Sequence, residues 1–463
     1  MTDQRGLWPT LTKATHIEPS SIARVNGPRR WWGGLLDVEW LALSSVQAAA
    51  TGLNLLTGRT FSVEAERVAA SFASISHLRI DGRHPESFSS MSGFHRTHDG
   101  WVRLHANYPH HLQALQRALQ AQQPEDLVAA LREREARDIE QLVRAAGGVA
   151  AAVRTAAEWR SSRMGIAGAA GPWIRFRATG IPVRRWEPPR DAAEAPLRGL
   201  RVLDLTRVIA GPSASRILGA LGADVLRVDP PGIPELTDQH VDTGFDKRSI
   251  VLDLHEPYGL ETLRHLLDDA HALVLGYRDG SLSGFEIEED RVSIDRPGLR
   301  VVRLNAWGQE GPWKQERGFD SIVQAACGIA DLYRSEDGTP GALPVQALDH
   351  ATGMGVVAAL SALLASDHVD SATLSLARTA HELMTHPMRP GPSTLPEVPL
   401  RSMAETAYGP LSFVPPPLHV DGQGLEYTAG PVEYGTSQPW FLDAPPDGPH
   451  MSWSEGQAPP RAD

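Results

Sequence analysis

Asp349 and His350 stand side by side in PVQALDHATGMGVVAALSALL, residues 344–364, which otherwise consists mainly of small and apolar residues. The apolar spacing predicts a buried helix. Asp349 falls at its N-terminal end, where free N–H groups and the helix dipole stabilise negative charge by about 0.3–1 kcal/mol. A helix cap therefore explains Asp349 without a function, and a helix-start or surface position explains His350. The functional alternative is a carboxylate that stays ionised at pH 7, as a nucleophile attacking an acyl carbon requires.

A second candidate is GLRVLDLTRVIAGPSASRILGALGADVLRVDPPG, residues 199–232, which predicts strand, loop, helix and strand, with Asp229 at the end of the second strand. Gly-Pro-Ser at 211–213 suits the helix start and Gly222 its end. The pattern is typical of the first βαβ unit of a doubly wound fold, where the loop receives a phosphorylated ligand. The G-x-G-x-x-G of dinucleotide sites is missing. A structural crossover and a nucleotide-containing ligand other than a dinucleotide both remain open.

Basic and aromatic residues flank two further predicted strands. Lys247 and Arg248 precede one strand, and Tyr277 and Arg278 follow another. Such residues could hold phosphates and stack on a base, although solvated surface charge explains them equally simply.

The elements that position these candidates indicate an α/β protein. Short β-rich runs lie at 200–205, 225–228, 249–254, 272–277 and 299–305, and helical patterns at 213–222 and 257–270 lie between several of them. This alternation predicts βαβ units and a mostly parallel, doubly wound sheet covered on both faces. Upstream, the spacing predicts helices over 38–56 and 63–78, a turn at 99–100, a strand over 101–106, a helix from about 110 and one charged helix over 125–148.

Prolines and charges at 187–199 indicate a domain boundary. We expect an N-terminal extension over 1–35, a helical segment with a small α+β domain over 36–186, a large Rossmann-like domain over 197–385, a proline-rich return segment over 386–440 and a disordered tail over 441–463.

Composition narrows the function classes. Hydrophobic residues make up 41% and charged residues 22% of the 463 residues, which is ordinary for a soluble globular protein. The net charge of −12 argues against a nucleic-acid partner. The single Cys327 excludes an internal disulfide, and with no Cys/His cluster a metal site is not expected. No secretory pattern or uninterrupted apolar run of about 18 residues is present, so we expect a cytoplasmic protein without a membrane segment.

Several segments together resemble the class III CoA-transferase family, which includes formyl-CoA transferase and carnitine CoA-transferase, with α-methylacyl-CoA racemase as a relative. Between residue 197 and about residue 380 they occur in the family's order: LRGLRVLDLTRVIAGPSASRILGALGADVLRVDPPG, DKRSIVLDL, ALVLGYRDG, LRVVRLNAWGQEGPWKQERGFDSIVQAACGIA and ALDHATGMGVVAALSALLA. Residues 63–185 resemble the family's small domain, which ordinarily follows the large one. Its position here is similar to a circular rearrangement, or to a fusion of a truncated copy with a large domain.

The resemblance implies that Asp349 is the catalytic aspartate of a CoA-transferase, which attacks an acyl-CoA thioester and forms a mixed anhydride and then an aspartyl-CoA thioester. Coenzyme A, as acyl-CoA, and a carboxylic acid are the implied substrates, with no metal, and a homodimer, possibly interlocked, is implied as well. The implied CoA contacts are Ile209, Ala210, Lys247, Tyr277, Arg278, Arg317, Phe319 and Asp320.

Departures from the family pattern leave two alternatives. Racemases place a histidine where Phe319 stands, and a phenyl ring cannot carry a proton, so a transferase is favoured over a racemase or epimerase. Pro230 and Gly284 occupy positions where relatives supply arginines for CoA, and FSSMSGFHRTHDGW occupies the place of a poly-glycine loop. These changes motivate a non-catalytic acyl-CoA-binding subunit as the second alternative.

Overall fold

The structure is a computed structural model that describes residues 6–15, 22–86, 88–178, 180, 185–188, 195–285, 287, 289–386, 389–393 and 399–442. The tail predicted over 441–463 lies, from residue 443 onward, outside the described residues.

A seven-stranded sheet forms the centre of the molecule. Its strands lie in the order β11 (Arg248–Val251), β10 (Asp224–Asp229), β9 (Arg201–Leu205), β12 (Ala272–Leu275), β13 (Arg300–Asn305), β14 (Ser371–Ser375) and β8 (Arg175–Arg177). The first six are parallel, and β8 pairs antiparallel with β14. With β9 as the first strand, this is the 3-2-1-4-5-6 order of doubly wound sheets. The predicted α/β class and parallel sheet are confirmed.

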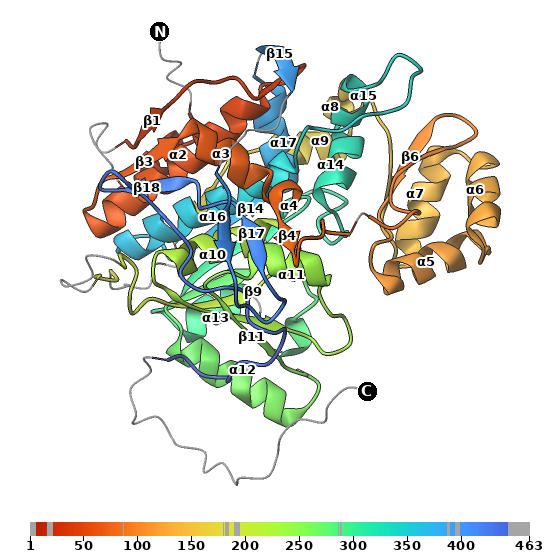
Figure 1. The fold of residues 1–463 in the computed structure, drawn as a ribbon. Helices are drawn as coiled ribbons and strands as arrows, with labels where there is room; N and C mark the ends of the chain where they lie inside the picture. Colours follow the sequence, from red (N-terminus) through yellow and green to blue (C-terminus); the bar gives the residue numbers. More distant parts are fainter. Residues whose placement is uncertain are drawn as a thin grey trace.

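Helices cover both faces of this sheet (Figure 1). The helices α10 (Ala210–Ala220) and α16 (Ala347–Ala365) lie on one face, and α12 (Pro257–Asp269) and α13 (Glu289–Asp295) on the other. Successive side chains of a strand point to opposite faces, and β9 shows this: Val202 joins the first core, whereas Leu203 joins the second.

The N-terminal part of the chain completes the first core. Helix α2 (Val38–Thr57) packs along α16, and a Cβ added at Gly52 would meet the carbonyl oxygen of Ala358 at 3.0 Å. On the other side of α16, a Cβ at Gly353 would collide with the carbonyl oxygen of Ala210. The small residues of α16 thus permit the close helix packing that buries it. By length and composition α16 could cross a membrane, yet it is buried throughout, as core helices of soluble proteins are.

Strands from the two ends of the chain pair with each other. The strand β3 (Phe61–Glu64) pairs with β18 (Leu418–Val420), and β4 (Arg79–Ile80) pairs with β17 (Leu411–Phe413). Residues 399–442 therefore return to the N-terminal region. The other elements are α1 (Pro9–Thr15), β1 (Arg24–Asn26), β2 (Trp32–Gly34), α3 (Ala65–Phe72), α4 (Ser74–His77), α8 (Ala156–Ser161), α9 (Arg163–Ala169), α11 (Thr237–Thr243), a 3-10 turn (Ser283–Phe285), α14 (Asp320–Cys327), α15 (Ile329–Leu332), α17 (Leu376–Met384), β15 (Arg389–Ser393), β16 (Arg401–Met403) and β19 (Gln423–Gly424).

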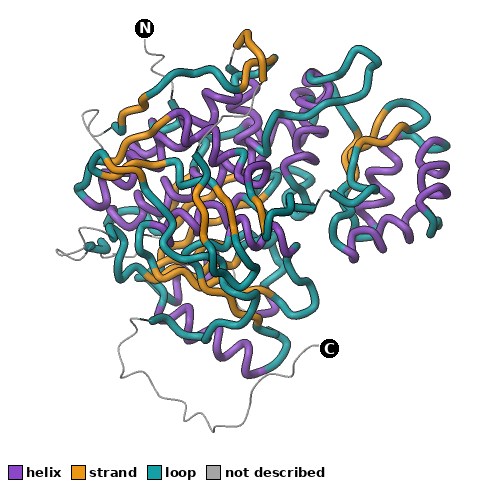
Figure 2. The backbone as a smooth tube through the Cα atoms, viewed as in Figure 1, coloured by secondary structure: helices purple, strands orange, loops and turns teal. Residues whose placement is uncertain are grey.

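Residues 94–152, which we call the small unit, have a hydrophobic core of their own. Figure 2 shows the strands and helices of this unit at the right-hand side of the molecule. Its antiparallel sheet contains β5 (Phe94–Arg96), β6 (Trp101–Leu104) and β7 (Ala150–Ala152), and its helices are α5 (Pro109–Leu119), α6 (Pro124–Arg132) and α7 (Ala136–Ala145). The segment 36–186, expected as one unit, thus contributes to two cores.

The prediction of a single charged helix over 125–148 is wrong, because α6 ends at Arg132 and α7 begins at Ala136. The break is made by the hairpin turn: Asp99 Oδ1 accepts a hydrogen bond from the Ala136 N–H at 2.8 Å, and the His98 N–H donates to the Arg134 carbonyl at 2.9 Å. These contacts between residues far apart in the chain hold the start of α7, and the local spacing of apolar residues does not predict them.

Candidate functional site

Asp349 is the third residue of α16 and is 6% exposed. It does not cap its own helix, so the cap interpretation is wrong. Asp320, the first residue of α14, does so instead: its Oδ2 accepts hydrogen bonds from the N–H groups of Leu348 at 2.9 Å and Asp349 at 3.0 Å. The Gln324 amide donates to the other oxygen of Asp320. Two carboxyl groups from different helices are therefore held together in the protein interior.

Burial governs the charge of this pair. Burial, and then the negative charge of Asp320, raise the pKa of Asp349 well above its usual value. Burial also raises the pKa of Asp320, to about 6, although its N–H donors and Arg103 oppose the rise. Since those donors stabilise an ionised Asp320, the arrangement keeps the proton on Asp349. The ionised Asp349 expected from the sequence is not favoured here, because the residue lies deeper than a helix end on the surface.

His350 is the fourth residue of α16, so it lies at the helix start as expected, but it is buried rather than on the surface. Burial lowers its pKa to about 3, so the imidazole is neutral at pH 7. Its ring lies tilted against Phe72, with ring centroids 5.2 Å apart.

A cleft of about 1310 Å³ runs past the head of α16. Gln346 and His350 of α16 line it, as do Ser321 and Gln324 of α14. The small unit contributes Arg103, Asn107, Tyr108, Pro109, His110 and Gln113, and the loop before α10 contributes Ile209. Asp349 is not among the lining residues, although His350, the next residue in the chain, is.

A second cavity, of about 420 Å³, lies at the carboxyl ends of β9, β10, β11 and β12. Its lining is mainly apolar and includes Val228, Leu252, Tyr277 and Phe285. Gly232 and Ile233 line both this cavity and the cleft, so the two adjoin. Parallel sheets of this order bind ligands at the carboxyl ends of their strands.

The candidate CoA contacts divide by location. Ile209 faces the cleft and Tyr277 faces the second cavity, whereas Ala210 packs between α10 and α16. Lys247 lines neither space: its Nζ is buried 3.5 Å from Asp204 Oδ2 and 3.0 Å from Ser215 Oγ. Burial lowers the pKa of Lys247 to about 8. This lysine is neutralised inside the protein rather than presented to a phosphate.

Three further candidates, Arg278, Arg317 and Phe319, do not line either space. Burial lowers the pKa of Arg317, and the positive charge of Arg278 lowers it further. Arg278 donates to the Gln315 carbonyl at 3.2 Å. The Phe319 ring stacks on the His105 imidazole with centroids 3.8 Å apart.

Comparisons with known proteins bear on the segment that holds these residues. Residues 197–389 match the model of CoA-transferase family III. The resemblance inferred from the sequence is therefore confirmed over this family III segment, which contains Asp349 and all the candidate CoA contacts.

Individual relatives match over part of their length. The succinyl-CoA:glutarate CoA-transferase of Mus musculus is 31% identical over 45% of this chain and 48% of its own. The formyl-CoA:oxalate CoA-transferase of Streptomyces coelicolor is 28% identical over 55% of this chain and 62% of its own. The chain thus spans about half the length of these relatives. A crystal structure of Rv3272 from Mycobacterium tuberculosis is 28% identical over 41% of this chain and 57% of that one, with a TM-score of 0.38.

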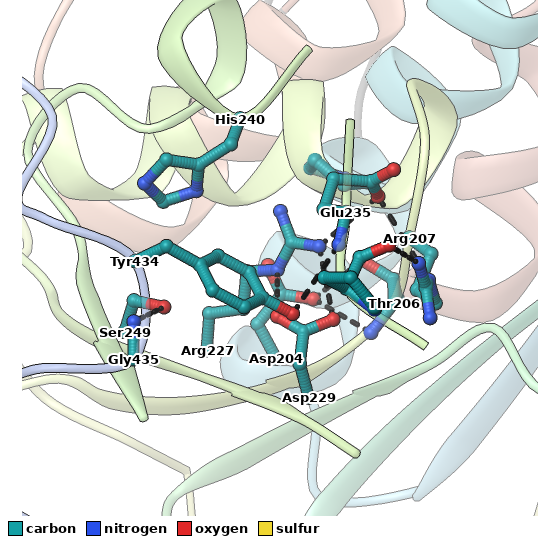
Figure 3. A network of polar contacts seen from close by, with 12 residues as sticks. Asp204, Thr206, Arg207, Arg227, Asp229, Glu235, His240, Ser249, Tyr434 and Gly435 are labelled. Atoms are coloured by element: carbon teal, nitrogen blue, oxygen red, sulfur yellow. Dashed lines mark hydrogen bonds and ion pairs between the residues drawn. The ribbon is translucent and has the colours of Figure 1, made fainter. Parts of the chain in front are cut away.

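A buried ion cluster, centred on Arg227 in the family III segment, was not predicted from the sequence (Figure 3). Arg227 pairs with Asp229 at 2.6 Å and with Glu235 at 3.1 Å. Glu235 also accepts hydrogen bonds from the Tyr108 hydroxyl and from the Val208 N–H, the latter at 2.8 Å. Val208 has φ +69°, a strained conformation for a β-branched residue. Because successive side chains of a strand alternate between its two faces, Arg227 and Asp229 of β10 lie on one face. No local sequence pattern predicts that Glu235 or Tyr108 joins them.

In the described part of the chain, no group of three or more His, Cys, Asp or Glu side chains is arranged to hold a metal ion.

Proposed function

We propose that this protein transfers CoA from an acyl-CoA to a carboxylic acid and that Asp349 is the nucleophile. The observation that carries the proposal is the place of Asp349: it belongs to the family III segment and stands in the first turn of α16, next in the chain to His350, which lines the cleft. The named CoA-transferases among its relatives support the same reaction class.

The reaction follows from a carboxylate attacking a thioester. An oxygen of Asp349 bonds to the acyl carbon and the C–S bond breaks, giving a mixed anhydride and CoA thiolate. The thiolate attacks the aspartyl carbonyl, releases the donor acid and leaves an aspartyl-CoA thioester. The acceptor carboxylate attacks that thioester and expels the thiolate, which then takes the new acyl group and frees Asp349.

Asp349 must lose its proton and reach the cleft before it attacks. A substrate that draws the start of α16 toward the cleft separates Asp349 from the charge of Asp320 and exposes it to water. Both changes lower its pKa, because burial and that charge are what raise it. The proton then leaves through the cleft, and the carboxylate attacks.

The two adjoining spaces suit the two ends of an acyl-CoA. The adenosine end fits the 420 Å³ cavity, where Tyr277 supplies an aromatic face. The mutual repulsion of Arg278 and Arg317 supports a place for the diphosphate near their side chains, because an anion between two guanidinium groups relieves it. From there, the pantetheine arm passes Ile233 into the cleft toward α16.

Trapping with hydroxylamine tests the proposal. The protein is incubated with a panel of acyl-CoA esters and hydroxylamine, and peptide mass spectrometry then locates any hydroxamate. We expect modification at Asp349, with loss of activity, only when a productive donor is present. Asp331→Asn, at a half-buried position of α15 where the carboxylate pairs with Arg334, is the matched control, and we expect it to keep full activity. A broad donor panel that leaves Asp349 unmodified contradicts the proposal and favours a non-catalytic subunit.

Racemisation is the second candidate, and the stack of His105 on Phe319 favours it. An imidazole from the small unit lies against the ring that replaces the racemase histidine. Burial lowers the pKa of His105 to about 3, and the residue does not line the cleft, so we rank racemisation below transfer. Uptake of deuterium at the α-carbon of a branched acyl-CoA in D₂O, lost in His105→Gln, would reverse that order.

The assembly proposed from the family resemblance is a homodimer. Analytical ultracentrifugation of the 50.2 kDa chain tests it, and a mass near that of one chain contradicts it.

A further inference from the structure

Arg103 on β6 is a charged residue of the small unit that lines the cleft. Its Nε is buried with no hydrogen-bond partner among the residues that the structure describes. Its guanidinium lies over the Phe94 ring, 4.9 Å from the centroid, which holds the planar group in place.

Several buried or largely buried arginines among the described residues have carboxylate partners. Arg154, next to the small unit, holds both oxygens of Glu140 at 2.7 Å. Arg227 is paired twice in the ion cluster. For Arg103, no described carboxylate lies within ion-pairing distance, and Asp320 acts on it only through space. Asp320 is already occupied by the N–H groups of α16 and by Gln324.

An unpaired, partly buried guanidinium is costly to the folded protein unless an anion completes it. Its fork of N–H groups matches the two oxygens of a carboxylate. Arg103 belongs to the small-unit wall of the cleft, whereas the reacting carbon must lie beside α16, where Asp349 is. A carboxylate bound to Arg103 on that wall can then be a second one, separate from the carboxylate that reacts beside α16.

We propose that Arg103 receives the distal carboxylate of a dicarboxylic substrate and makes the site selective for such acids. This assignment rests on the proposed CoA transfer. A linear dicarboxylic acid places one carboxylate on Arg103 and the other at the aspartyl thioester, while a monocarboxylic acid of equal length leaves the guanidinium unpaired.

Matched acceptor pairs test the assignment. With one fixed acyl-CoA donor, kcat/KM is measured for C4 to C6 dicarboxylic acids and for the monocarboxylic acids of the same length. We expect the wild-type protein to prefer a dicarboxylic acid by at least about 10-fold, and Arg103→Gln to lower its kcat/KM by about 10- to 100-fold while the monocarboxylic acid changes less than about 3-fold. For Arg103→Lys, which keeps the charge without the fork of N–H groups, we expect a kcat/KM for the dicarboxylic acid between those of the wild-type protein and Arg103→Gln.

Arg96→Gln is the matched control. Arg96 lies on the neighbouring strand β5, over the Trp101 ring, and is exposed outside the cleft. We expect it to keep the wild-type preference, and thermal melts confirm that each variant is folded. Equal losses for both acid types in Arg103→Gln and Arg103→Lys, or a wild-type protein without preference, overturn the assignment. Absence of transfer to every acid, with no hydroxamate at Asp349, overturns the proposed function itself.

Discussion

Two pairs of buried carboxylates, Asp229 with Glu235 and Asp320 with Asp349, differ in their surroundings. Asp229 and Glu235 share Arg227, and the Tyr108 hydroxyl and the Val208 N–H add hydrogen bonds. Asp320 and Asp349 have N–H donors on one member only, and neither forms an ion pair among the described residues.

The outcome for charge differs accordingly. Burial alone would raise the pKa of Glu235, but Arg227 and Arg207 lower it below its usual value. Burial does raise the pKa of Asp229, although Arg227 opposes that rise. The pKa of Asp349 rises, because burial and Asp320 act in the same direction. Compensated buried charges hold elements in place, whereas an uncompensated carboxyl group costs stability and is retained where chemistry needs it. The ion cluster therefore joins β10, the loop before α10 and the small unit, whereas the acid pair is the one that the proposed mechanism uses.

The largest effect is expected from removing the reactive carboxylate. Asp349→Asn keeps the size and position of the side chain but removes the nucleophile. We expect CoA transfer to fall by roughly 10⁴-fold or more, as loss of a nucleophile does in other enzymes. Single-turnover assays measure acyl transfer, with circular dichroism as a check on the fold. A variant within about 10-fold of wild-type activity contradicts the nucleophile assignment.

Breaking the compensated cluster should instead destabilise the protein. Arg227→Met leaves Asp229 and Glu235 buried without their shared cation, and such a change costs about 3–5 kcal/mol. The free energy of unfolding in urea measures it. The double variant Arg227→Met, Glu235→Gln removes one stranded charge and should recover part of the loss. Equal stability of the single variant and the wild-type protein would show that the cluster does not hold the fold.

The comparison also shows what a sequence can and cannot predict. Alternating β-rich and helical runs predicted the strands from β9 to β13 and the helices α10 and α12, because those elements bury local, periodic faces. The order of the family segments singled out Asp349. The sequence suggested its partner Asp320 only as a CoA contact, and it did not suggest Arg103. The contact of Asp320 with α16 and the place of Arg103 at the cleft both depend on packing between segments far apart in the chain.

The acid pair should also reveal itself in the dependence of stability on pH. Because the folded pKa of Asp349 lies above its unfolded value of about 4, the folded protein binds the proton more tightly, and stability falls as the pH rises through that interval. Asp349→Asn lacks this loss, so its stability relative to the wild-type protein should be higher at pH 8 than at pH 4. Urea unfolding at both values measures the gap. A gap that is constant or widens toward low pH contradicts the raised pKa.

The smallest effect tests how far the compensated cluster reaches into the small unit. Tyr108 lines the cleft, and its hydroxyl donates to Glu235, the one hydrogen bond by which a residue of the small unit enters the ion cluster as described. Tyr108→Phe removes that bond, but Glu235 keeps Arg227 and its backbone donors. We therefore expect a loss of only about 0.5–1.5 kcal/mol in urea unfolding. In the Arg227→Met background the same change should cost more, because the hydroxyl is then one of few groups left to stabilise Glu235. Equal costs in both backgrounds would mean that Tyr108 and Arg227 act independently, and that the small unit is held by contacts outside the cluster.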